Sequence, residues 1–256
     1  MKYTGLIAPG VGNFLAAVRV GLLAQGWTSL GTVAANHEVF RSTGVGGTEN
    51  IIIAINDSVS GSVGFRACTA YDDFTKILSN PTTYRYIQLS TTLTMPWWTY
   101  VKQNYFMAIV KNFVASPYAL TYCGLLSRYD ATDATCIICS GSTTTTGTPL
   151  GVAHSNTFAG GGFQLLQDHA GVYNKTINGI ALNPGFGASQ LPNPVDGKII
   201  ISPILAGLAS SEIHGELYDC YSVAQASVAS EDVLTFGADT YLCFIISTYQ
   251  CAIKET

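Results

Sequence analysis

Hydrophobic positions near the N-terminus recur at the spacing of a helix. Between Val11 and Gln25 the apolar side chains return every three or four residues, which places them on one helical face. They are Phe14, Leu15, Val18, Leu22 and Leu23. Gly26 follows, and glycine readily adopts the positive φ at which many helices end. The pattern therefore predicts a helix over residues 11–25.

Beyond Trp27 the pattern becomes typical of β-strands. Short runs rich in β-branched and aromatic residues alternate with clusters of Gly, Asn, Asp and Ser, which favour turns. The predicted strands span residues 51–55, 63–65, 84–89, 105–110, 198–204, 217–223 and 241–246. We therefore expect a mainly β chain with one or two antiparallel β-sandwich-like lobes and an N-terminal helix. No run of about 18 apolar residues occurs, so no membrane span is predicted.

A segment rich in Ser and Thr interrupts the strand pattern. Residues 140–150 contain too little apolar surface to pack by themselves, which indicates an exposed loop or a lobe boundary. The expected organisation is a helix plus β lobe over 1–139, this loop, and a second β-rich lobe over 151–256. A single continuous domain is the alternative.

Charge is scarce along the whole chain. The 256 residues include 12 Lys or Arg and 16 Asp or Glu, whereas average soluble domains carry about a quarter charged residues. The net charge of −4 and the lack of a Lys/Arg cluster argue against direct nucleic-acid binding. A weakly charged surface suits contact with other protein, so we interpret the chain as an assembly subunit and expect a homo-oligomer.

The seven cysteines are odd in number and lie in apolar, strand-like surroundings. They are Cys68, Cys123, Cys136, Cys139, Cys220, Cys243 and Cys251. We expect reduced, buried thiols that pack as small hydrophobic side chains. A zinc site at Cys136-Ile-Ile-Cys139 would need two further ligands at similar spacing, and the sequence supplies none, so no metal or cofactor is predicted. A disulfide between Cys243 and Cys251 remains open.

Known catalytic motifs do not occur in the sequence. The loop from Gly44 to Thr48 has no lysine and leads into a strand, unlike a phosphate-binding loop. No GxSxG motif occurs, and the four histidines, His37, His154, His169 and His214, sit in unrelated contexts. The acids Asp72, Asp73, Glu212, Glu216, Asp219, Glu231 and Asp232 show no spacing diagnostic of glycoside hydrolysis. We therefore expect no enzyme, with a hydrolase as the weakest alternative.

Aromatic residues are concentrated between positions 97 and 129. Alternating aromatic side chains form cross-strand pairs in a core, anchor protein interfaces, or offer faces for sugar rings. The interface candidates are Trp97, Trp98, Tyr100, Tyr118 and Tyr122.

Three blocks of the chain, taken in order, carry a resemblance to a known family. The first comprises 26–28 and 39–44, the second 95–98, 105–111, 116–118 and 122–126, and the third 213–218, 230–234 and 240–244. In this order the blocks resemble a family of virion structural proteins of tailed bacteriophages. The resemblance implies a non-enzymatic particle subunit that is assembled in the host cytoplasm and contacts other virion proteins, in the neck, tail or baseplate. A receptor-binding or capsid-decoration protein that contacts cell-surface glycans is the alternative.

Overall fold

The computed structural model describes residues 1–111, 118–129, 136–141, 152–153, 163–168, 170–181, 201–208, 212–223, 228–246 and 249–255. This part of the chain is mainly β, with several antiparallel sheets and one helix, α1 (Asn13–Ala24). The expected fold class is therefore confirmed. Within the described residues, α1 has 12 residues and no helix has the length and hydropathy to span a membrane.

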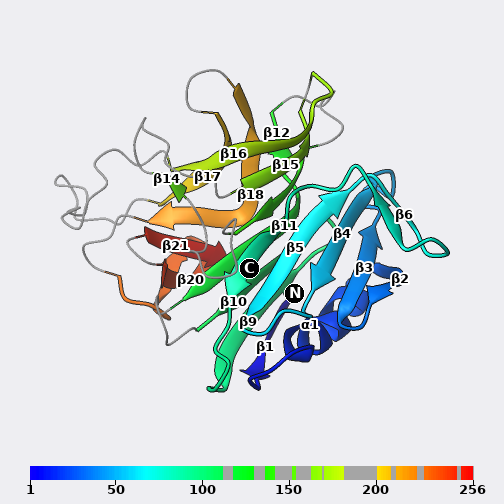
Figure 1. The fold of residues 1–256 in the computed structure, drawn as a ribbon. Coiled ribbons are helices and arrows are strands. Elements are labelled where there is room, and N and C mark those ends of the chain that lie inside the picture. Colours follow the sequence, from blue (N-terminus) through cyan, green and yellow to red (C-terminus); the bar gives the residue numbers. More distant parts are fainter. Residues whose placement is uncertain are drawn as a thin grey trace.

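The strands form one large sheet, one smaller sheet and a hairpin (Figure 1). The smaller sheet has the order β2 (Thr28–Ala34), β3 (His37–Ser42), β4 (Ile51–Asn56), β5 (Ser62–Cys68) and β8 (Arg85–Gln88). The hairpin pairs β6 (Ala70–Asp72) with β7 (Ile77–Ser79). The large sheet has the order β1 (Lys2–Ile7), β9 (Met95–Val101), β10 (Tyr105–Val110), β11 (Ala119–Leu125), β13 (Ile137–Ser140), β15 (Phe163–Gln167), β16 (Tyr173–Ala181), β17 (Ile201–Leu208), β18 (Glu212–Val223), β21 (Tyr249–Lys254), β20 (Asp239–Ile246) and β19 (Val233–Phe236). Two short strands lie outside this linear order: β12 (Ser127–Arg128) pairs with β18, and β14 (Val152–Ala153) pairs with β16.

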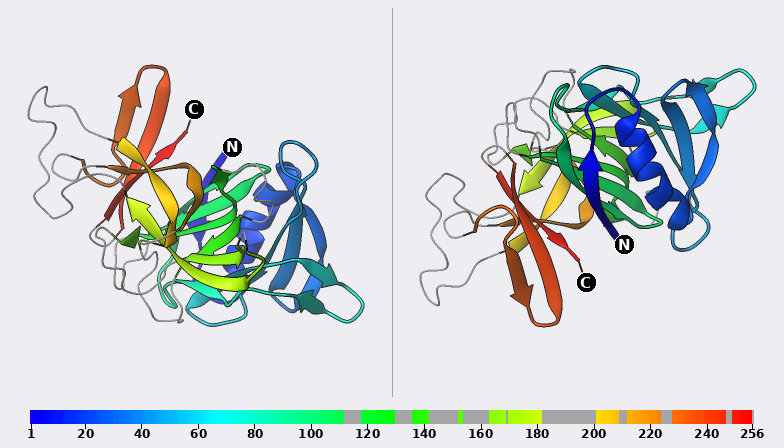
Figure 2. Two further views of the ribbon diagram at one scale, coloured as in Figure 1. Left: turned by 90° about the horizontal axis from the view of Figure 1, so that it is seen from above. Right: turned by 90° about the horizontal axis from the view of Figure 1, so that it is seen from below.

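The strands β9, β10 and β11 form a central layer that is covered on both faces. Every side chain of β10 and β11 is buried. On β10, Phe106 points into a first core with α1 and the five-stranded sheet, whereas Tyr105 and Met107 point into a second core with the C-terminal strands. Figure 2 shows the same arrangement, with the five-stranded sheet in blue on one side of the green central strands and the orange to red C-terminal strands on the other. The two cores therefore share one sheet.

Helix α1 is fixed to the first core through its N-terminus. Gly12 occupies the N-cap position with a φ of 83° and has no side chain to cap the helix. The buried carboxylate of Asp57, which directly follows β4, instead accepts the backbone N–H groups of Phe14 (2.8 Å) and Leu15 (3.1 Å). A residue distant in sequence thus satisfies the first free N–H groups of the helix.

The large sheet continues past the boundary predicted at residues 140–150. Residues 142–150 lie outside the described part of the chain, but β13 on one side of them pairs with β15 on the other. The second core also contains residues from both sides, such as Tyr105 and Phe244. This continuity favours one domain, and the division into two lobes stays a prediction.

Three polar clasps join the central layer to the C-terminal strands. In each, a tyrosine hydroxyl from the central layer or its edge donates to a carboxylate from the C-terminal part, and a lysine ammonium binds the same carboxylate. Charge-assisted hydrogen bonds of this kind are stronger than neutral ones. The clasps are Tyr100–Glu255–Lys2, Tyr105–Asp219–Lys102 and Tyr118–Glu231–Lys111.

A first prediction concerns the central layer. Replacing Phe106, which is fully buried and packs against Phe14 and Phe65, by Ala should lower the free energy of unfolding by about 3–5 kcal/mol because it leaves a cavity. The same change at Phe74, which is 95% exposed, should alter that free energy by no more than about 0.5 kcal/mol. Urea unfolding of both variants measures the difference, and equal losses would contradict the assignment of the core.

A second prediction uses the clasp at Glu231. Hydrogen bonds from Lys111 and Tyr118 lower the pKa of Glu231 below its ordinary value of 4.5. A carboxyl with a lowered pKa in the folded state stabilises the fold above pH 4.5, and this contribution disappears as the pH falls through the folded-state pKa. Wild type should therefore be more stable than Glu231→Gln above pH 4.5, and the difference should shrink at lower pH. A pH-independent difference in urea unfolding would show that the carboxylate charge is not involved.

Candidate interaction surface

Four of the five aromatic interface candidates lie in the cores of this chain. Trp97 belongs to the first core, and Tyr100, Tyr118 and Tyr122 belong to the second. Trp98 is half-buried and packs against Phe244, with ring centroids 5.2 Å apart. These positions fall on β9 and β11 or beside them, in the layer that is covered on both faces. The chain itself already covers the four buried side chains and leaves them little surface for a partner, whereas the interface assignment of the five residues stays a prediction.

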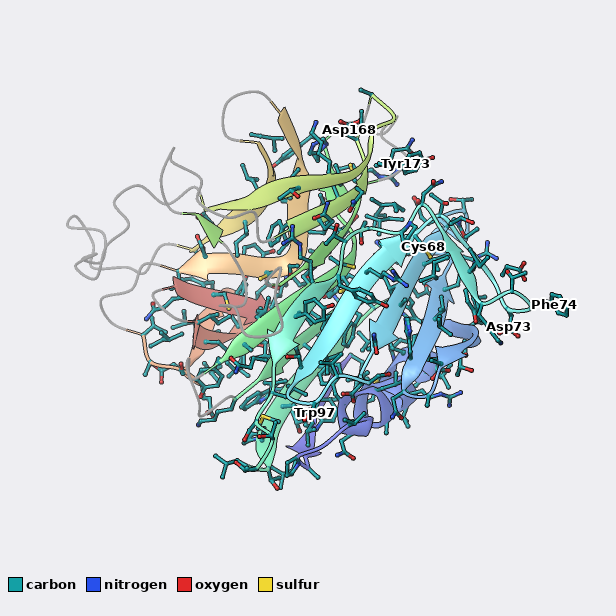
Figure 3. All side chains as sticks on the ribbon, viewed as in Figure 1. Cys68, Asp73, Phe74, Trp97, Asp168 and Tyr173 are labelled. Carbon is teal, nitrogen blue, oxygen red and sulfur yellow. The ribbon has the colours of Figure 1, made fainter. Side chains whose placement is uncertain are left out.

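The outer face of the five-stranded sheet, turned away from the first core, carries the most distinctive exposed groups. The hairpin β6–β7 packs on this face through Tyr71 and Leu78, over the apolar side chains of Val39, Ile52, Ala54 and Cys68. The hairpin then projects beyond the sheet, as Figures 1 and 3 show. The remainder of the face carries polar and aromatic side chains from β3, β5, β8 and the residue that precedes β8.

The tip of the hairpin is held by its own side chains. The carboxylate of Asp72 accepts the N–H groups of Phe74 (2.9 Å) and Thr75 (3.3 Å) and the hydroxyl of Thr75 (2.8 Å). These hydrogen bonds, led by that of the Thr75 hydroxyl, lower the pKa of Asp72. Lys76 completes the turn with a φ of 60° and forms an ion pair with Asp73. The tip therefore has a defined conformation.

Contacts with β2 orient the hairpin as a whole. The hydroxyl of Tyr71 donates to the carbonyl oxygen of Thr32 (2.9 Å) and to the carboxylate of Asp73 (3.2 Å). Gly31 of β2 has a φ of 127°, and a Cβ atom at this position would lie 2.0 Å from an oxygen of Asp73. Only glycine allows this approach without strain.

The ordered tip presents apolar side chains to solvent. Phe74 is 95% exposed and Ile77 is 60% exposed. Figure 3 shows Phe74 at the far end of the hairpin, pointing away from the rest of the protein. Single exposed hydrophobic residues are common, but Phe is enriched in interfaces, and here the backbone beneath it is fixed. This Phe74 hairpin is the candidate contact with another protein.

A second group on the same outer face combines aromatic rings with a cation. The hydroxyl of Tyr84 is hydrogen-bonded to Nε2 of His37 (3.0 Å), and the guanidinium of Arg66 lies 4.2 Å from the centre of the Tyr84 ring. The ring of Tyr86 lies beside that of Tyr84, at 5.7 Å. Gly64 of β5 makes room for both rings, because a Cβ atom there would come within 2.9 Å of each. We call these four side chains the tyrosine platform.

Burial keeps the histidine of the platform neutral. It lowers the pKa of His37 from 6.5 to about 4, and the positive charge of Arg66 adds to this effect. Burial also raises the pKa of Tyr84, so its hydroxyl stays protonated and can donate to His37. The platform thus offers aromatic faces and guanidinium donors for binding. Within the described ranges, no three side chains from His, Cys, Asp and Glu gather in a way that would hold a metal ion.

The other described residues considered for chemistry lie in separate parts of the fold. His214 is buried on β18, and His154 and His169 lie outside the described residues. Asp219 and Glu231 belong to the clasps, whereas Asp72 and Asp73 shape the hairpin. Sequence analysis missed both surface groups. The available signals were a Phe inside a polar turn and the alternation of Tyr84 and Tyr86 in the strand predicted at 84–89.

A third prediction follows from the environment of His37. Its pKa is lower in the folded state, so the unfolded chain binds more protons between pH 6.5 and about 4. Lowering the pH through this window should therefore reduce the stability that the wild type shows above pH 6.5, and His37→Asn should lose less. Histidine NMR shifts should give a midpoint of about 4. A midpoint near 6.5 would contradict the buried, neutral state.

In comparisons with known proteins, no family model matches the chain, and no curated protein matches it. The case for a function therefore depends on the chain's own residues and geometry.

Proposed function

We propose that this protein is a β-rich structural subunit of a tailed-phage virion that acts through self-association and contacts with adjacent virion proteins. The position that we propose is the neck, tail or baseplate. The observation that carries the proposal is the Phe74 hairpin, an ordered turn that holds an aromatic side chain almost completely out of contact with its own chain. The scarcity of charge and the family resemblance of the three sequence blocks support it further.

Such a hairpin can add favourable free energy to a contact while the chain loses little conformational freedom. Fully burying a Phe side chain contributes roughly 1.5–3 kcal/mol. Little backbone freedom is lost on contact, because Asp72 already fixes the tip. Asp73 is paired with Lys76, and the carboxylate of Asp72 is hydrogen-bonded within the turn, so each of these charged groups already has a partner when the interface forms. In a symmetric assembly, each copy repeats the same modest contribution.

The tyrosine platform favours a second candidate function, that of a receptor-binding or capsid-decoration protein that contacts glycans. The faces of Tyr84 and Tyr86 could stack on sugar rings, and Arg66 could donate hydrogen bonds to sugar oxygens. This candidate differs from the first in the surface that it uses and in the place of the protein on the particle.

Particle analysis tests the proposal directly. Antibody against this chain should label the neck, tail or baseplate in electron microscopy, and mass spectrometry should find the chain at fixed stoichiometry in purified particles. Label at fibre tips or across the capsid would replace the proposal by the second candidate. If mass spectrometry of purified particles does not find the chain, both are rejected.

A fourth prediction assigns the contact to the hairpin. Phe74→Ser should weaken self-association or incorporation into particles at least about tenfold, which corresponds to about 1.4 kcal/mol. Analytical ultracentrifugation and the amount of chain in purified particles provide the two measurements. The free energy of unfolding should stay within about 0.5 kcal/mol of wild type, because Phe74 supports nothing within the chain.

Val45→Ser is the matched control for this change. Val45 is also strongly exposed, at 74%, but it lies in the loop between β3 and β4, away from the hairpin sequence. The Val45→Ser variant should self-associate and enter particles as the wild type does. If Phe74→Ser assembles normally while Tyr86→Ser loses binding to glycan arrays, the tyrosine platform is the functional surface instead.

A further inference from the structure

The strand registers bring cysteines together in a way that their sequence positions do not reveal. All seven cysteines are buried, and none of them forms a disulfide in the structure. Four of them lie in two pairs of neighbours on adjacent strands, Cys123 with Cys139 and Cys220 with Cys251. The geometry of the two pairs differs, and this difference determines which pair a disulfide can join.

Cys123 and Cys139 lie directly opposite each other on the neighbouring antiparallel strands β11 and β13. The N–H of Leu126 donates to the carbonyl of Cys136 (2.9 Å), which marks Leu126 and Cys136 as a hydrogen-bonded pair in the same register. Hydrogen-bonded and non-hydrogen-bonded pairs alternate along an antiparallel ladder, so Cys123 and Cys139 form a non-hydrogen-bonded pair. The Cα atoms of such pairs are about 4.5 Å apart, within the range of disulfides.

Cys220 and Cys251 are offset along their ladder. Cys220 lies opposite Ile253, whereas Cys251 lies opposite Ser222. The two cysteines are therefore diagonal neighbours, about 7–8 Å apart, and a bond between them would require movement of the backbone.

The structure also excludes the pair that the sequence left open. Cys243 lies opposite Ala252, and Cys251 lies opposite Phe244, so the two cysteines occupy adjacent rungs of the β20–β21 ladder. Side chains on adjacent rungs point to opposite faces. In agreement, Cys251 packs in the second core and Cys243 in a separate apolar cluster.

We propose that Cys123 and Cys139 are a modification site, at which a low-molecular-weight disulfide such as oxidised glutathione converts the two thiols to a cross-strand disulfide. One thiolate attacks the glutathione disulfide and forms a mixed disulfide, which releases one glutathione thiol. The second cysteine, as its thiolate, then attacks the protein sulfur of the mixed disulfide and releases the second glutathione. The two protein thiols are oxidised, and one glutathione disulfide is reduced to two thiols.

The surroundings of the pair determine when it reacts. Burial raises the pKa of the Cys139 thiol well above its ordinary value, the hydrogen bond with Cys123 raises it further, and the charge of the buried Arg85 offsets only part of this effect. Because a thiolate is the reactive form, the native chain exchanges slowly. The bond forms while the chain folds or opens locally in an oxidising medium, and the thiols persist in a reducing one. This inference is independent of the proposed virion function.

A fifth prediction tests the site on the full chain. Refolded from urea in a mixture of reduced and oxidised glutathione, the chain should lose two of its seven thiols and two hydrogen atoms of mass. Non-reducing peptide mapping should join the peptides that contain Cys123 and Cys139. The thermal midpoint of the oxidised chain should exceed that of the reduced chain, because the bond restricts the unfolded state.

Two variants distinguish a bond between Cys123 and Cys139 from a bond between Cys220 and Cys251. Cys123→Ala should retain all of its remaining thiols in the same buffer, whereas Cys220→Ala should still lose two. The proposal is overturned if natively refolded wild type keeps all seven thiols, or if the mapped bond joins any other pair. If Cys123→Ala does not fold, Cys139→Ala provides the same comparison, and the wild-type peptide map decides by itself.

Discussion

Burial on both faces of the central strands is the constraint on which the rest of the structure depends. Every side chain of β10 and β11 is covered, so the layer needs packing partners on each side. The helix and the five-stranded sheet cover one face, and the C-terminal strands cover the other. Segments from the N-terminal part and from the C-terminal part of the chain must therefore both pack against this layer. This explains why β1 pairs with β9, far along the sequence, and why the clasp acids come from the C-terminal part.

The local elements could be predicted from sequence, whereas their partners could not. The strand predicted at 105–110 is the observed β10, and the helix predicted at 11–25 is observed at 13–24. The periodicity of apolar and polar residues indicates whether a segment is a helix or a strand. In a fully apolar strand such as β10, however, the sequence does not indicate which parts of the chain cover its two faces. For this reason Trp97 and Tyr122 could be core or interface residues until the pairing was known. The sequence does not predict that Phe74 is exposed on an ordered turn, because the hydrogen bonds of Asp72 create the geometry of that turn.

The few charges of the chain are largely engaged within it. Eight ion pairs join described residues, and they use eight of the 12 Lys and Arg side chains. Three of these pairs belong to the clasps, where a tyrosine hydroxyl shares the carboxylate. Exposed pairs contribute little to stability individually, but they leave few isolated charges at the surface. Such a surface loses little hydration when it meets another protein, which fits an assembly role.

The two surface groups differ in what they require of a partner. The Phe74 hairpin projects and presents the apolar side chains of Phe74 and Ile77, so its partner must provide a recess for them, and the contact gains from removing water. The side chains of the tyrosine platform are buried or half-buried, and their polar atoms are partly engaged already, since the Tyr84 hydroxyl is hydrogen-bonded to His37 and the Tyr84 ring lies against Arg66. A ligand there must compete with internal contacts, whereas a partner at Phe74 displaces only solvent. Because binding at the hairpin breaks nothing within the chain, the hairpin is the stronger basis for a repeated contact in an assembly.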